Sequence, residues 1–89
     1  MIFVALGTQK FQFNRLLQMI DWLLDEGKIK ETVFAQIGNS DYEPKNYKYA
    51  SFLDKNEFEE QIRKCDVLIT HSGVATIIAG LKNGKKVIV

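Results

Sequence analysis

The chain of 89 residues carries several short runs of mainly apolar side chains. Most of these runs end at a glycine or a polar turn-forming residue, which is typical of strands buried on both faces of a parallel sheet. A further segment alternates between polar and apolar positions and predicts a short edge strand. The predicted strands are residues 1–6, 32–37, 66–69 and 86–89, with the edge strand at 47–52.

Between the strands, apolar residues recur every three or four positions, which is the spacing of a helix with one buried face. Gly27 ends the first of these segments and Gly84 ends the last. Asp54 and Glu57 have the spacing of a capping box at the start of the middle one. The buried faces are marked by Phe13, Leu16, Leu17, Ile20, Leu23 and Leu24, then by Phe58, Ile62 and Cys65, and last by Val74, Ile77, Ile78 and Leu81.

Strands that alternate with helices of this length predict an α/β fold, a Rossmann-like parallel sheet with helices on both faces. In such sheets, ligands bind beyond the carboxyl ends of the strands, where the strand order reverses. Three polar turns follow predicted strands, at residues 7–9, 38–40 and 70–73. We expect these turns to meet at one rim of the sheet.

The turn at residues 70–76, with the sequence Thr-His-Ser-Gly-Val-Ala-Thr, is the first candidate for a site. It joins a buried strand to a helix through small residues, so backbone N–H groups and the positive end of the helix dipole would be available to a phosphate. It lacks the three glycines of a dinucleotide fingerprint and the Gly-Lys-Ser/Thr of a Walker motif. The pattern alone therefore leaves open a plain strand-to-helix turn, in which His71 caps its own helix or pairs with a carbonyl.

Polar residues near the other two turns also have either a structural role or a role in binding a ligand. Gln36 interrupts an otherwise apolar strand, so its amide is expected to be paired or to face a cleft. Gly7 suits a tight exit from the first strand, and Thr8 and Gln9 would either cap the next helix or face a ligand. Residues 41–46 are polar and contain the only proline, so they predict a loop.

Composition narrows the classes of function. Twelve basic residues face eleven acidic ones, which gives no argument for a nucleic-acid partner. One cysteine and one histidine cannot supply the usual ligands of a structural zinc, and Cys65 is interpreted as a core thiol. No apolar run is long enough to span a bilayer or to form a signal peptide, so we expect a cytoplasmic protein.

The order of these motifs resembles the glycosyltransferase family 28 C-terminal domain. The resemblance rests on the opening residues 1–9 and 11–17, on Phe34-Ala35-Gln36-Ile37-Gly38, on residues 66–73 and on residues 77–89, so it covers nearly the whole chain. The most similar branch is that of the small catalytic subunits of two-component UDP-sugar transferases. These include the subunit that adds N-acetylglucosamine to dolichol-linked precursors and its bacterial capsule and exopolysaccharide counterparts.

The resemblance implies that residues 1–89 are a single, partial domain that binds the UDP-sugar donor of a GT-B glycosyltransferase. A hexosyl or N-acetylhexosaminyl group would pass to a lipid-linked acceptor, with a membrane-associated partner subunit supplying the other half of the enzyme. Helix N–H groups would stabilise the departing UDP, so no metal or cofactor is expected, and no catalytic base is assigned. The implied donor-binding residues are Gly7, Thr8, Gln9, Gln36, Gly38, Asn39, His71, Ser72, Gly73, Val74, Ala75 and Thr76.

Two features depart from the family pattern. Ala75 and Thr76 stand where the family usually has a second glycine followed by serine, and the added methyl group of alanine would crowd a phosphate. Family members also continue past the last strand with a Pro-Arg-like turn and a polar segment, whereas Val89 ends this sequence. A fold truncated after the last strand would expose a sheet edge or face and favour self-association or a partner.

Two other functions remain open at this level. The first is a catalytically inactive interaction module that docks a glycosyltransferase partner, favoured by Ala75 and by the missing C-terminal segment. The second is an unrelated nucleotide-binding or receiver-like α/β domain, although the acidic cluster that a receiver needs at its strand ends is absent from the sequence. On the transferase hypothesis, the protein is cytoplasmic and reaches the membrane through its partner subunit.

Overall fold

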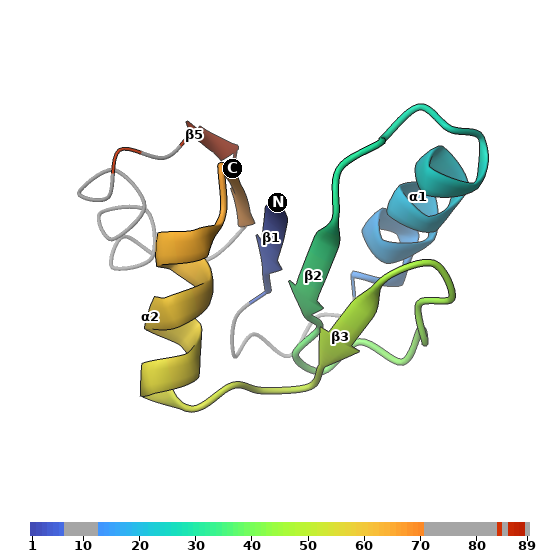
Figure 1. Cartoon of the computed structure of the whole chain (residues 1–89). Helices are drawn as coiled ribbons and strands as arrows, with labels where there is room; N and C mark the ends of the chain where they lie inside the picture. The colour runs from blue at the N-terminus through green and yellow to red at the C-terminus, as the bar shows by residue number, and fades with distance from the viewer. Residues whose placement is uncertain (7–12, 71–83, 85, 89) are drawn as a thin grey trace.

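The structure, a computed structural model, describes residues 1–6, 13–70, 84 and 86–88 (Figure 1). The described strands and helices follow one another in the order that the hydrophobic pattern predicts, and the predicted helix around residues 74–81 lies outside the described residues. The described elements are β1 (Ile2–Ala5), α1 (Asn14–Asp25), β2 (Val33–Gln36), β3 (Lys48–Ala50), α2 (Lys55–Lys64), β4 (Val67–Thr70) and β5 (Lys86–Ile88).

The strands form one sheet in the order β3-β2-β1-β4-β5, and each neighbouring pair is parallel. The chain first winds outward from β1 through β2 to β3, then crosses back to β4 and β5, so the order reverses between β1 and β4. The predicted parallel α/β sheet is confirmed. The predicted edge strand is also confirmed, because β3 lies at one edge and exposes Lys48 and Tyr49.

The two faces of the sheet hold separate cores. On one face, Val4 and Ala35 pack with Leu17 of α1. On the other, Phe3 packs with Ile62 and with the ring of Phe58, whose centroid is 5.5 Å away. Since side chains alternate along a strand, these cores lie on opposite faces, and Figure 1 shows α1 and α2 apart with strands between them. The prediction of helices on both faces is confirmed.

The helix boundaries follow from local chemistry. Asp54 Oδ1 accepts a hydrogen bond from the N–H of Glu57 at 2.8 Å, which is the N-terminal half of the predicted capping box. At the end of α1, Gly27 has a φ of 72°, and the N–H of Lys28 donates to the carbonyl of Leu23 at 2.9 Å. This geometry is a Schellman motif, which favours glycine at the left-handed position, so the predicted stop at Gly27 is confirmed.

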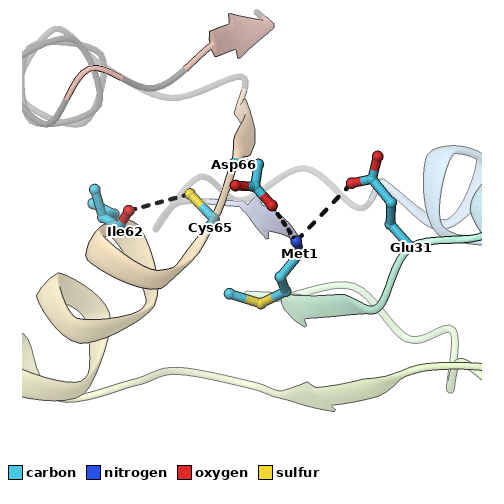
Figure 2. Close-up of polar contacts among 5 residues, drawn as sticks. All are labelled: Met1, Glu31, Ile62, Cys65 and Asp66. Atoms are coloured by element: carbon cyan, nitrogen blue, oxygen red, sulfur yellow. Dashed lines mark hydrogen bonds and ion pairs between the residues drawn. The ribbon is translucent and has the colours of Figure 1, made fainter.

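The amino ends of β1 and β4 are tied by the chain terminus (Figure 2). The Met1 ammonium donates to Asp66 Oδ2 at 2.6 Å and lies 4.0 Å from Glu31 Oε2. The hydrogen bond to Asp66 is the main reason that the pKa of this amino group is raised. Cys65 follows α2, is fully buried and lies with Sγ 3.2 Å from the carbonyl of Ile62, which agrees with its interpretation as a core thiol.

A buried carboxylate holds the predicted loop at residues 41–46 against α1. Asp21, on α1, is only 5% exposed. Its carboxylate accepts hydrogen bonds from the Tyr42 hydroxyl, from the N–H of Lys45 at 2.9 Å and from the N–H of Asn46 at 2.8 Å. Burial opposes the ionisation of Asp21, but these hydrogen bonds outweigh it and lower the pKa of the carboxyl group. The sequence pattern gave no sign of this contact.

Replacing Asp21 by asparagine should destabilise the fold by about 1–3 kcal/mol at pH 7, because backbone donors lose a charged acceptor. The pKa of Asp21 is lower in the folded chain than in the unfolded one. Ionised Asp21 therefore stabilises the fold above about pH 4, and this contribution is lost as the pH falls through the folded-state pKa. Urea denaturation over a series of pH values should show the difference between the two proteins becoming smaller as the pH falls below about 4. Glu59→Gln, at an exposed position of α2, is the control, and an equal effect of both changes at pH 7 would contradict the assignment.

Candidate functional site

The carboxyl ends of the central strands lie level with one another. Ala5 of β1 is the partner of Gln36 on one side and of Thr70 on the other. The predicted rim is therefore confirmed for the strands that lead into the three polar turns. Of the predicted site residues, the structure describes Gln36, Gly38 and Asn39; those outside the described residues are Gly7, Thr8, Gln9, His71, Ser72, Gly73, Val74, Ala75 and Thr76.

Gln36 joins three segments of the rim. Its side chain is buried, and its Nε2 donates to the carbonyl of Leu6 at 2.8 Å, just beyond β1. Its Oε1 accepts from the N–H of Leu53 at 2.9 Å, between β3 and α2. The expectation that this amide is paired is confirmed. Both ends of the amide bind backbone groups, so Gln36 supports the rim by holding these segments together.

Gly38 and Asn39 form the turn that follows β2. Gly38 is buried, has a φ of 61° and donates its N–H to the carbonyl of Ser51 at 2.9 Å. A positive φ favours glycine because other residues place a Cβ atom too close to the backbone. Asn39 is exposed between buried Gly38 and buried Ser40, so it is the residue of this turn that reaches the solvent at the rim.

A pair of polar side chains joins this turn to the start of α1. Ser40 Oγ accepts a hydrogen bond from the N–H of Phe13 at 2.9 Å. In the other direction, Asn14 Oδ1 accepts from the N–H groups of Asp41 and Tyr42, at 2.9 and 3.0 Å. The start of α1 and the turn after β2 are therefore fixed to each other. Sequence reasoning missed Asn14 and Ser40, and their only signal was a polar residue at a helix start and at a turn.

The two described residues that flank residues 7–12 are also held by hydrogen bonds. Leu6, before this segment, exchanges hydrogen bonds with Gln36, since its N–H donates to the Gln36 backbone carbonyl at 3.0 Å and its own carbonyl accepts from Gln36 Nε2. Phe13, after it, is held by Ser40 and is partly buried against the core. Leu6 and Phe13, the described residues on either side of this segment, are thus held by β2 and by the turn after it, respectively.

Thr70 makes the corresponding connection on the other side of β1. It is 2% exposed, and its Oγ1 donates to the carbonyl of Ala5 at 2.9 Å. Its hydroxyl therefore ties the end of β4 to the end of β1, directly before the predicted phosphate-binding turn. The side chains of Gln36 and Thr70 are thus buried and bonded within the protein, and Asn39 is the described residue of the predicted site that is exposed to solvent.

Two further properties concern only the part of the chain that is described. In residues 1–6, 13–70, 84 and 86–88, no group of three or more His, Cys, Asp or Glu side chains is gathered so that it could hold a metal ion. Over the same ranges, none of the helices has the length and apolar character needed to cross a membrane.

The fold and the rim define a Rossmann-like α/β domain whose central strands end level with one another where the strand order reverses. The model of the glycosyltransferase family 28 C-terminal domain matches residues 1–89, and the chain belongs to this family. The sheet and the two described helices, α1 and α2, are consistent with the C-terminal domain of a GT-B enzyme, and the family is one of sugar transfer. Neither the curated proteins nor the solved structures contain a match to this chain.

Replacing Gln36 by leucine should lower the free energy of unfolding by about 1–3 kcal/mol for each backbone group left buried without a partner. The groups affected are the Leu6 carbonyl and the Leu53 N–H. Chemical denaturation measures the loss, and amide hydrogen exchange at Leu53 should accelerate. Gln61→Leu on α2 is the matched control. If both variants are equally stable, the Gln36 amide does not support the rim.

Proposed function

We propose that this domain binds the UDP-sugar donor of a glycosyltransferase at the rim formed by β1, β2 and β4. It would transfer a hexosyl or N-acetylhexosaminyl group to a lipid-linked acceptor, together with a membrane-associated partner subunit. The observation that carries the proposal is the level register of Ala5, Gln36 and Thr70 at the reversal of strand order, in a chain of a sugar-transfer family.

The topology supports a donor site between β1 and β4. Ligands of open α/β sheets bind at the carboxyl side of the point where the strand order reverses. Gly7, Thr8 and Gln9 follow β1 directly, and the segment from His71 to Thr76 follows β4. Both segments therefore leave the sheet at adjacent strand ends, and Asn39 is exposed at the end of the neighbouring strand.

The proposed chemistry is stabilisation of a departing nucleoside diphosphate. Backbone N–H groups at a helix start carry partial positive charge, so groups from Ser72 to Thr76 would bind the diphosphate and favour its release. This arrangement needs no metal ion, and no cofactor besides the donor is proposed. Gly38 and Asn39 would border the same cleft, and the partner subunit would supply the acceptor side.

We also propose a branch of the family and a cellular location for this protein. The motifs resemble those of small catalytic subunits of two-component transferases, so we infer a protein of the cytoplasm that reaches the membrane through its partner. A catalytically inactive domain that only docks such a partner is the alternative outcome. The two differ in one measurable property, since only the transferase domain should bind UDP at the rim.

An amide-resolved NMR titration of the chain with UDP, with and without Mg²⁺, tests the proposed site. We expect saturable shifts at Gly7, Thr8, Asn39 and the segment from Ser72 to Thr76, equal in both conditions, because backbone N–H groups rather than a metal hold the diphosphate. A well-dispersed spectrum without shifts would favour the docking module. Shifts that need Mg²⁺ would contradict the metal-free chemistry.

Substitutions at the turn after β4 should separate binding from folding. His71→Ala and Gly73→Leu should each weaken UDP binding about 3- to 10-fold or more, since each removes or blocks a hydrogen bond to the donor. Isothermal titration calorimetry measures the affinity, and thermal denaturation measures the stability. Lys55→Ala, on the exposed side of α2, is the control. A loss of melting temperature that accounts for the loss of binding would assign the turn a structural role.

A further inference from the structure

The side of α1 that faces away from the sheet carries two large apolar residues. Met19 is 52% exposed and Trp22 is 51% exposed. Together with Arg15 and Gln18 they line a shallow depression of about 420 Å³. These positions recur at helical spacing on the side opposite Leu17 and Ile20, which pack on the core. An exposed pair of this size at the centre of one helix face indicates an interaction surface.

The charges at the two ends of this face are opposite in sign. Arg15 lies in the first turn of α1, and Asp25 and Glu26 lie at its end. Each is at the pole of the helix dipole that disfavours its charge, because anions are favoured at the amino end and cations at the carboxyl end. None of the three forms an ion pair with another described residue. The face is therefore electrostatically uncompensated within the described chain.

We propose that this face of α1 binds the same face of a second copy of the chain, with the two helices antiparallel. A two-fold axis near the middle of α1 makes the surface complementary to itself, as an isologous dimer requires. Arg15 and Asp25 are about 15 Å apart along the axis at 1.5 Å per residue, and Met19 and Trp22 lie on either side of the midpoint. Arg15 of each copy then faces the acidic end of the other helix, and the Trp22 side chains pack over Met19.

The same arrangement corrects the unfavourable dipole interactions. Asp25 and Glu26 of one copy come close to the amino end of the other helix, and Arg15 comes close to its carboxyl end. The surface shares no residue with the proposed donor site. One helix face is smaller than the roughly 800 Å² per partner of a standard interface, and the association is therefore weak and concentration dependent.

Sedimentation of the full chain over a range of concentrations tests the proposal, with Trp22 as a built-in probe. Trp22 is the only tryptophan, so its fluorescence emission should shift to the blue as the mass rises from monomer to dimer. Added salt should weaken the dimer, because its ion pairs are exposed. A chain that stays monomeric, or a dimer that forms without any change in Trp22 emission, would overturn the proposal.

Charge-reversal variants test whether the two copies of α1 are antiparallel. Arg15→Glu alone, or Asp25→Lys with Glu26→Lys, should weaken dimerisation about 3- to 30-fold through the loss of two symmetric sets of ion pairs. Combining all three substitutions should restore it, because the pairs re-form with opposite sign. Lys55→Glu makes the same change in charge on α2 and should leave the dimer intact, and circular dichroism verifies folding. Failure of the combined variant to recover would exclude the antiparallel α1 contact.

Discussion

The central strand β1 is the constraint on which the rest of the structure depends. It pairs in parallel with β2 on one side and β4 on the other, so both rows of its backbone groups are used. Its side chains alternate between two cores, with Phe3 and Val4 both fully buried. Since a shift of one residue would exchange these faces, the register of β1 fixes the placement of α1 and α2 and aligns the strand ends that form the rim.

The rim is held by polar side chains that bind backbone groups of neighbouring segments. Gln36 and Thr70 connect the ends of β2 and β4 to the end of β1, and Ser40 and Asn14 connect the turn after β2 to α1. Strand ends leave carbonyl and N–H groups outside the ladder, and burial makes unpaired groups costly. The same side chains therefore satisfy these groups and hold together the strand ends beyond which a donor is proposed to bind.

Helix α1 has a different role on each of its sides. Leu17 packs on the sheet, Asp21 binds the loop that follows the rim, and Trp22 and Met19 face outward. A helix of twelve residues presents these sides at fixed angles because its period is 3.6 residues. The loop, the core and the proposed dimer surface are thus connected through one rigid element, whose end is set by the Schellman motif at Gly27.

The sequence by itself determined the order of elements, the parallel sheet, the stop at Gly27, the cap at Asp54 and the family, because periodicity, turn residues and motif order are local properties. It also predicted that three polar turns meet at one rim, and of the residues predicted for that site, Gln36, Gly38 and Asn39 are described. Only the tertiary structure decided what the polar side chains contact: the pairing of Gln36 with Leu6 and Leu53, the Ser40 and Asn14 contacts and the Asp21 cluster. These contacts join residues 17 to 30 positions apart, and no local pattern specifies which donor meets which acceptor once the chain has folded.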